Sequence, residues 1–178
     1  MSERVQRSRL LTIPNTLSFL RLPLGVLFML TESPTSRAII IALAATTDGL
    51  DGWLARKLRQ DVGPGQIVDP ITDKVFVLVA LATLAARGEL EPWMVLLLLA
   101  RDIYTSFAYF ILRILDWHAD FKARWSGKVA TVLQLAVMLA ALLLPWAVLP
   151  LIIATAFASL IAIADYTRVI LAQRRRAP

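Results

Sequence analysis

Four aspartates in the first half of the chain lie within or beside segments that are apolar enough to cross a membrane. Asp48 and Asp51 are three residues apart, and Asp69 and Asp73 are four residues apart. Residues at these spacings share one face of an α-helix. An acidic residue near the centre of a bilayer costs about 2.5–3.5 kcal/mol on insertion scales. Four of them at membrane depth therefore require something positive to bind.

The composition fits a membrane protein and limits the kind of metal site. Of the 178 residues, 58% are hydrophobic, and the mean hydropathy is +0.66. These values are too apolar for a soluble domain and are typical of a small polytopic membrane protein. The chain has no cysteine and a single histidine, His118. Any bound metal would be held by oxygen atoms, which favours hard cations such as Mg²⁺, Mn²⁺ or Ca²⁺.

Six apolar segments are each about as long as the 17–25 residues that a membrane-spanning helix needs. They cover residues 13–31, 36–56, 67–86, 92–114, 127–145 and 147–171. The breaks between them contain glycine, proline, serine or charged residues, which favour turns. The last break is apolar and short, which leaves the separation of the last two segments open. We expect an all-α fold: one domain over residues 1–178, a six-helix transmembrane bundle with its active site at the cytoplasmic end.

The net charge of +6 is distributed unevenly along the chain. With six spans, one side carries most of the basic residues near the membrane, and the other side has Arg37 and Arg87. The basic side holds Arg4, Arg7, Arg9, Arg56, Lys57, Arg59, Lys122, Arg124, Lys128, Arg174, Arg175 and Arg176. The positive-inside rule then places both termini in the cytoplasm, and we expect the inner membrane of a prokaryote. These charges indicate contact with anionic lipid headgroups of the bilayer and not with nucleic acid.

Small residues accompany the first aspartate pair. At 100° per residue, Asp48, Asp51, Gly52 and Ala55 fall within one wedge of a helix. Small side chains let a large ligand approach the backbone. The Gly63–Pro64–Gly65 sequence could fold the next helix back, so that all four carboxylates converge. Their repulsion would be relieved by divalent cations, and we expect two for so many oxygens.

Two other interpretations of the aspartates are open. Each aspartate could cap a helix or form an ion pair with a nearby basic residue. Asp69 before Pro70 has the pattern of a helix N-cap, and Asp51 could pair with Lys57. Alternatively, paired acids could form the ion path of a divalent-cation transporter. A transporter predicts acids spread along a pore, whereas these are bunched at one end beside glycine, alanine and arginine. The bunching favours an enzyme.

The spacing D-x2-D-G-x2-A-R-x8-G-x3-D-x3-D resembles the signature of the CDP-alcohol phosphotransferase family. Its eight positions are Asp48, Asp51, Gly52, Ala55, Arg56, Gly65, Asp69 and Asp73. The length and hydropathy also resemble the family, so the resemblance covers most of the chain. It implies transfer of a phosphatidyl or similar group from a CDP-linked donor to an alcohol, with release of CMP. It also implies CDP-diacylglycerol as donor and a homodimer.

The resemblance also implies roles for individual residues. Asp48, Asp51 and Asp69 would be ligands of Mg²⁺ or Mn²⁺, and Asp73 would be both a ligand and the base for the acceptor hydroxyl. The implied cytidine-diphosphate site consists of Asp48, Gly52, Ala55 and Arg56. The chemistry agrees, because displacement at a pyrophosphate needs negative charge neutralised at the attacking and leaving oxygens. A carboxylate is also a suitable general base.

The segment I-P-N-T-L-S-F-L-R at residues 13–21 resembles the N-terminal part of the phosphatidylglycerophosphate and cardiolipin synthases of this family. Asn15, Thr16 and Arg21 are therefore candidates for nucleotide or phosphate contact, and we assign Asn15 and Thr16 to the nucleotide site. An equally good alternative is that Asn15 and Thr16 only start a helix. In that case Arg21 would extend toward the membrane interface.

The acceptor site is less well marked. Arg101, Arg113, Arg124 and Lys128 are candidates to hold an acceptor phosphate. Arg101 and Asp102 could instead form an internal salt bridge, and Arg124 and Lys128 could be plain flanking charges. The favoured acceptor is glycerol 3-phosphate, which gives phosphatidylglycerophosphate. The alternative acceptor is phosphatidylglycerol, which gives cardiolipin. At the position of the Arg101–Asp102 pair, phosphatidylglycerophosphate synthases usually have Arg-Glu. The Arg-Asp form resembles the eukaryotic-type cardiolipin synthases.

Overall fold

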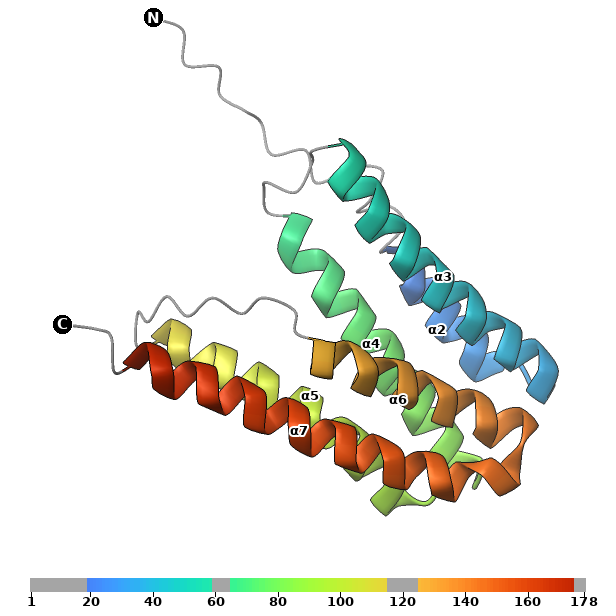
Figure 1. Ribbon diagram of the computed structural model, residues 1–178. Helices are drawn as coiled ribbons and strands as arrows, with labels where there is room; N and C mark the ends of the chain where they lie inside the picture. The colour runs from blue at the N-terminus through green and yellow to red at the C-terminus, as the bar shows by residue number, and fades with distance from the viewer. Residues whose placement is uncertain (1–18, 59–64, 115–124, 175–178) are drawn as a thin grey trace, which may run out of the picture. The chain divides into compact units, whose positions relative to one another are not determined.

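The computed structural model describes the backbone of residues 19–58, 65–114 and 125–174 (Figure 1). Within these ranges every regular element is helical, which confirms the all-α class. In chain order the elements are α2 (Arg21–Leu30), α3 (Pro34–Leu58), α4 (Gly65–Ala86), α5 (Pro92–Ile114), α6 (Trp125–Leu143), the short 3-10 helix η1 (Pro145–Ala147) and α7 (Val148–Arg174). The chain divides into two compact units, Met1–Thr83 and Leu84–Pro178.

The helix boundaries follow the turn chemistry of the sequence. Pro34 and Pro92 are the first residues of α3 and α5, where the missing N–H of proline has no helical partner to lose. Gly88 follows α4 with φ +73°, a left-handed conformation that suits glycine. At the last break, η1 separates α6 from α7. The last two apolar segments are therefore separate helices.

One expectation about a helix boundary is wrong. The Asp69–Pro70 pair has the sequence pattern of an N-cap, but α4 begins at Gly65 and continues through both residues. Asp69 therefore lies inside the helix, in its second turn. Proline at position 70 removes one i→i−4 hydrogen bond near the start of the helix. The capping interpretation of Asp69 is excluded, and the interpretations that need Asp69 and Asp73 on one helix remain.

In the first unit, α2 packs against α3 and α4. The guanidinium of Arg37 on α3 lies 5.8 Å from the centre of the Phe28 ring on α2, within the range of a cation–π contact. On the other side of α2, a Cβ atom on Gly25 would lie 3.7 Å from Val79 and 3.8 Å from Phe76 of α4. The buried side chains here are mainly apolar: they include Phe28, Ile40, Ile41, Ala44, Phe76, Ala80 and Leu81.

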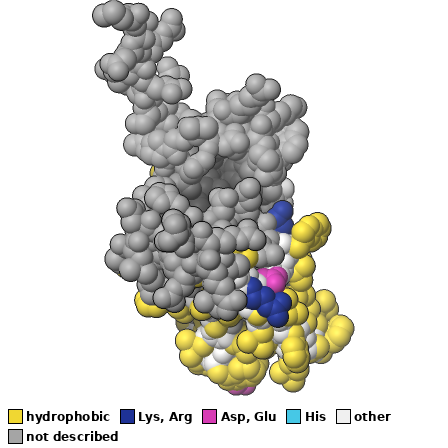
Figure 2. All heavy atoms as spheres, turned by 60° about the vertical axis from the view of Figure 1, so that its left-hand side comes forward, with side chains coloured by type: hydrophobic (Ala, Val, Ile, Leu, Met, Phe, Trp, Pro, Cys, Tyr) yellow, Lys and Arg dark blue, Asp and Glu magenta, His cyan; other side chains and the backbone are white. Residues whose placement is uncertain are grey.

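In the second unit, α6 and α7 form an antiparallel hairpin, and α5 packs along α7 (Figure 1). Val137 and Met138 of α6 and Ile152 of α7 are almost completely buried. Large apolar side chains on the opposite faces, such as Phe157 and Leu160, are exposed. In Figure 2 the coloured side chains on one face of the molecule are mostly hydrophobic. Apolar surface of this extent indicates contact with lipid or with another protein.

Among the described residues, two helical segments are long and apolar enough to cross a membrane. They are Trp125–Leu143, with hydropathy 1.7, and Pro145–Ile170, with hydropathy 2.5. Together with the exposed apolar side chains they indicate a membrane protein. The six predicted segments correspond to the helices α2 to α7, but the six-span arrangement stays a prediction. The assignment of residues 1–178 to one domain likewise stays a prediction.

Candidate functional site

The first aspartate pair lies on one continuous helix. Because α3 runs from Pro34 to Leu58, the backbone positions of Asp48, Asp51, Gly52, Ala55 and Arg56 are all helical. The helical spacing predicted for the first half of the signature is thus confirmed. The side chains of residues 48–71 lie outside the part of the chain whose side chains the structure describes. The ligand and nucleotide roles of these residues stay predictions.

The second aspartate pair also lies on one continuous helix, because α4 runs from Gly65 to Ala86. Asp73 has a described side chain, which is half-buried. Six residues join Leu58 to Gly65. A chain extends at most about 3.3–3.6 Å per residue, so the two helix ends lie within about 25 Å of each other. Figure 1 shows the C-terminal end of α3 and the N-terminal end of α4, which carry the two halves of the signature, at the same end of the first unit.

The aspartate positions continue the inward-facing sides of both helices. On α3, the buried residues Ile41 and Ala44 lead in helical register to positions 48, 52 and 55. On α4, the buried residues Ala80 and Phe76 lead back to positions 73 and 69 by steps of about one turn. Both faces are packed inside the first unit where the structure describes them. Asp51 lies about one turn after Asp48 on α3, so this register supports convergence of the four aspartates.

Arg21, the first residue of α2, is completely buried. The alternative in which its side chain extends to the membrane interface is therefore wrong. Gly25 is level with Phe76 and Val79 of α4. Helices α2 and α4 run in the same direction, each antiparallel to α3 (Figure 1). One turn back, about 6 Å along the axis, brings Arg21 level with Asp73. The other N-terminal candidates, Asn15 and Thr16, lie outside the described residues.

The aspartate set has the chemistry of a hard-cation site. The four residues supply only carboxylate oxygens, and the chain has no cysteine to compete for a softer metal. Among the described side chains, no group of three or more histidine, cysteine or acidic residues could hold a metal. That search did not include Asp48, Asp51 or Asp69, whose side chains are not described. The residues fit Mg²⁺ or Mn²⁺, and the site itself stays a prediction.

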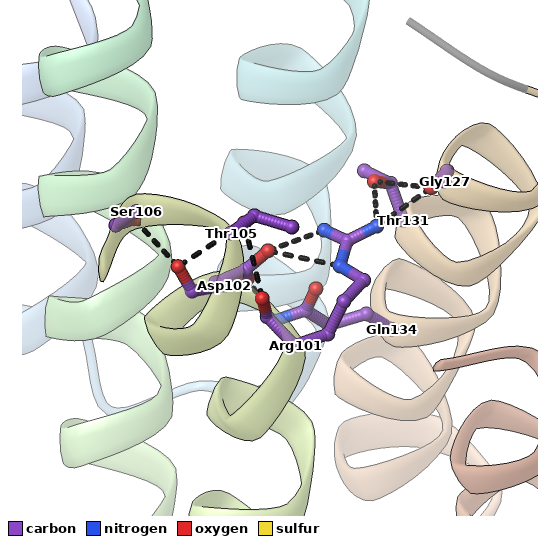
Figure 3. Close-up of polar contacts among 7 residues, drawn as sticks. All are labelled: Arg101, Asp102, Thr105, Ser106, Gly127, Thr131 and Gln134. Atoms are coloured by element: carbon purple, nitrogen blue, oxygen red, sulfur yellow. Dashed lines mark hydrogen bonds and ion pairs between the residues drawn. The ribbon is translucent and has the colours of Figure 1, made fainter. Parts of the chain in front are cut away.

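In the second unit, Arg101 and Asp102 on α5 form an internal salt bridge (Figure 3). The Nε atom of Arg101 donates a hydrogen bond to Oδ1 of Asp102 at 3.0 Å, and Nη2 pairs with the same oxygen. The remaining nitrogen, Nη1, donates to the carbonyl oxygen of Gly127 at 2.6 Å and to Oγ1 of Thr131 at 3.0 Å. All three guanidinium nitrogens thus have protein partners. These contacts favour the structural interpretation of Arg101 over phosphate binding.

Asp102 has a further contact with α6, since Nε2 of Gln134 lies 3.4 Å from its Oδ2. Gln134 is itself 4% exposed. The other acceptor candidates are placed less fully. Lys128 is exposed in the first turn of α6, and Arg113 lies on α5 with its side chain outside the described part. Arg124 lies outside the described residues altogether. Their phosphate roles stay predictions.

Two tyrosines that sequence reasoning did not single out join helices of the second unit. The hydroxyl of Tyr104 on α5 is 2.6 Å from Oγ1 of Thr167 on α7. A Cβ atom on Gly127 would lie 2.9 Å from the hydroxyl oxygen of Tyr166 on α7. The available signal was a run of polar residues, Asp165 to Arg168, at the end of an otherwise apolar segment. Nothing in that run indicates which helix each side chain contacts.

Comparison with known proteins gives consistent matches. The family model described as CDP-alcohol phosphatidyltransferase matches residues 11–164. An Aquifex aeolicus protein named CDP-diacylglycerol–glycerol-3-phosphate 3-phosphatidyltransferase is 41% identical over 98 residues, which cover 52% of this chain and 55% of that protein. An Escherichia coli K12 protein with the same name is 34% identical over 142 residues, which cover 71% of this chain and 74% of that protein.

A relative with a different product in its name is similar over a comparable part of the chain. A Streptomyces coelicolor protein named cardiolipin synthase (CMP-forming) is 38% identical over 137 residues, which cover 72% of this chain and 63% of that protein. The chain thus spans 55% and 63% of the Aquifex and Streptomyces relatives. The family model includes all eight signature positions and extends over most of the chain. The protein therefore belongs to the CDP-alcohol phosphatidyltransferase family.

Proposed function

We propose that the protein transfers the phosphatidyl group of CDP-diacylglycerol to an alcohol and releases CMP, as a step of phospholipid synthesis. The observation that carries this proposal is the aspartate signature. Its eight positions lie on two helices, and the register of positions 48, 52, 55, 69 and 73 continues the inward faces of the first unit. Family membership gives the same reaction class. The favoured acceptor is glycerol 3-phosphate, after the names of the Aquifex and Escherichia relatives.

The reaction is a displacement at phosphorus. The acceptor hydroxyl oxygen attacks the phosphorus of the phosphatidyl group, and the bond from that phosphorus to the bridging oxygen of CMP breaks. CMP leaves with the electron pair, and the hydroxyl proton passes to a carboxylate of Asp73. Asp73 suits this task because it is half-buried on α4, next to a buried threonine and at the aspartate end of the unit.

Asp48, Asp51, Asp69 and Asp73 would hold the divalent cations, Mg²⁺ or Mn²⁺, and two ions suit four carboxylates. When bound, such ions neutralise the charge of the pyrophosphate and of the leaving CMP. Gly52 and Ala55 would leave room for the nucleotide beside the backbone, with Arg56, Asn15 and Thr16 as its polar contacts. Arg21 supplies a buried positive charge at the level of Asp73.

The acceptor phosphate would be held by Arg113, Arg124 and Lys128. Glycerol 3-phosphate is a small dianion, and several converging cations would bind it through charge-assisted hydrogen bonds. Arg101 contributes indirectly in this proposal, since its nitrogens contact Asp102 and α6. The first turn of α6 carries Lys128, which is exposed.

Cardiolipin synthesis from phosphatidylglycerol is the second candidate. It is favoured by the Streptomyces relative, which aligns with 72% of this chain, and by the Arg101–Asp102 pair. A divalent-cation transporter is disfavoured, because the family match extends across the whole signature. We also propose a homodimer in the inner membrane of a prokaryote, with both termini in the cytoplasm.

An acceptor panel tests the proposal. Purified protein is supplied with CDP-diacylglycerol, Mg²⁺ and either glycerol 3-phosphate or phosphatidylglycerol, and CMP and lipid products are measured. We expect phosphatidylglycerophosphate from glycerol 3-phosphate. Cardiolipin formed from phosphatidylglycerol alone would replace the first candidate by the second. No CMP release with either acceptor would overturn both.

A further inference from the structure

The first two turns of α6 are held from both sides by the other helices of the second unit. From α5, the Nη1 atom of Arg101 donates to the Gly127 carbonyl at 2.6 Å and to the Thr131 hydroxyl at 3.0 Å. The Thr131 hydroxyl also donates to the Gly127 carbonyl at 3.0 Å. From α7, Tyr166 comes so close to Gly127 that a Cβ atom there would lie 2.9 Å from its hydroxyl oxygen. Three helices thus meet at Gly127, and Figure 3 shows the contacts from α5.

The charge of Arg101 is balanced within this cluster. The side chains of Arg101 and Asp102 are 11% and 20% exposed, so most of both is shielded from water. In such surroundings hydrogen bonds are stronger than in water, and an unpaired charge is costly. Asp102 is in turn fixed by Gln134, a buried residue of α6. The pair therefore acts as a neutral clamp from α5 to α6 and leaves no net charge for a phosphate.

The clamp lies next to a candidate acceptor residue. Lys128 follows Gly127 directly and is exposed at the start of α6. We propose that Arg101 and Asp102 are positioning residues that fix the first turns of α6, and so hold Lys128 where it meets the acceptor phosphate. This inference rests on the proposed function and adds a residue pair that shapes acceptor affinity without touching the acceptor. Loosening the clamp should weaken acceptor binding and leave donor binding in place.

Two variants weaken the clamp mildly enough to keep the fold. Arg101→Lys keeps a positive charge beside Asp102 but cannot bridge to both Gly127 and Thr131. Thr131→Val removes one partner on α6 and leaves the salt bridge intact. Thr155→Val is the control for loss of a threonine hydroxyl, because the Thr155 hydroxyl donates within its own helix, to the Leu151 carbonyl at 2.7 Å. Each of these three variants is also combined with Lys128→Ala in a double-mutant cycle.

The apparent KM for the acceptor and for CDP-diacylglycerol is measured for each full-length variant. The acceptor is glycerol 3-phosphate, or phosphatidylglycerol if the panel selects it. We expect Arg101→Lys to raise the acceptor KM about tenfold, as for loss of a hydrogen bond to a charged group, with the donor KM changed less than about twofold. In the Lys128→Ala background, Arg101→Lys should raise the acceptor KM little further. If the effects of Arg101→Lys and Lys128→Ala on the acceptor KM simply multiply in the double variant, the inference is overturned. An unchanged acceptor KM in Lys128→Ala would also overturn it.

Backbone hydrogen exchange gives a readout that does not depend on activity. Amides of residues 125–131 should exchange faster in Arg101→Lys and Thr131→Val than in the wild type or in Thr155→Val. Unchanged exchange in both clamp variants would overturn the inference even if the enzyme is active. Absence of CMP release by the wild type would overturn the proposed function instead, and faster exchange would still support the clamp.

Discussion

At the scale of single residues, two buried arginines of the first unit occupy different settings. Arg21 is 0% exposed at the start of α2, level with Asp73, and Arg37 is 2% exposed near the start of α3. Arg37 stacks on the ring of Phe28, and its Nη2 atom lies 3.5 Å from the Glu32 carbonyl, at the end of the unit away from the aspartates. The two buried arginines thus lie at opposite ends of the first unit. Hydropathy could not distinguish them, because burial depends on which helix lies opposite.

Substitution of the two arginines should separate function from stability. We expect Arg21→Gln to lower CMP release at least about tenfold, because it removes a buried cation that the helix register places level with Asp73. One charge-assisted hydrogen bond is worth about 1.5–3 kcal/mol. Arg37→Gln should lower the unfolding temperature in detergent and leave kcat within about twofold. Steady-state kinetics and thermal unfolding of both variants test this. Equal loss of kcat in the two variants would show that Arg21 has no special place at the site.

At the scale of helices, sequence periodicity located the elements well but not all of their ends. Proline and glycine at residues 34, 88 and 92 lie where helices begin or end, as their backbone preferences predict. Asp69–Pro70 shows the limit of this reasoning, because Gly65 starts α4 one turn earlier. Local sequence can mark several possible starts, and packing along the whole helix selects one. The contacts of Arg101 with α6 could not be predicted from the local sequence either, because they depend on how α5 packs against α6.

The small residues of the α3 signature predict a nucleotide-binding surface. Ala55→Leu keeps the helix, since leucine is a good helix former, but adds bulk on the aspartate face. We expect the affinity for CDP-diacylglycerol to fall at least about tenfold, a change of about 1.4 kcal/mol. Ala42→Leu is the matched control, because Ala42 lies on the same helix and is exposed. Equal donor affinity in both variants would place the nucleotide elsewhere.

The close approach at Gly127 predicts a packing effect that can be reversed. A Cβ atom there would lie 2.9 Å from the Tyr166 hydroxyl and 3.8 Å from the nearest ring carbons. Gly127→Ala should therefore destabilise the protein by about 1–3 kcal/mol, as is typical for overpacking. Tyr166→Phe in the same chain removes the closest atom and should restore part of the loss. The measurement is thermal unfolding of the two single variants and the double variant, and purely additive losses would contradict the contact.

At the scale of the whole molecule, the sequence predicts more than the described part of the structure tests. The six apolar segments match the helices α2 to α7, but among the described residues two segments meet the criteria for a span. The predicted topology depends on the charge bias between loops, which is read from the sequence alone. For the candidate site, too, some features follow from the sequence and others only from the structure. Helical register put the aspartates on inward faces, whereas the side-chain contacts of α5 and α6 required the tertiary structure.

The absence of cysteine from the chain allows a direct test of topology. Single cysteines at Ser2 and Ala177 should react with a membrane-impermeant maleimide only after the cells are permeabilised. A cysteine at Thr35, an exposed residue in the first turn of α3, should react in intact cells. This outcome follows from an even number of spans with basic loops in the cytoplasm. Labelling of one terminus but not the other in intact cells would require an odd number of spans.

The central claim is that the aspartates of α3 and α4 form one metal-dependent site for phosphatidyl transfer. Its most direct test measures CMP release from CDP-diacylglycerol by the wild type with Mg²⁺, with excess EDTA, and by Asp73→Asn. Asp61→Asn, a neighbouring aspartate outside the signature, is the control. We predict that EDTA abolishes release and Mg²⁺ or Mn²⁺ restores it. Asp73→Asn should slow it by about 10²–10⁴, as expected for loss of a general base. Full CMP release in excess EDTA, or by Asp73→Asn, would contradict the claim.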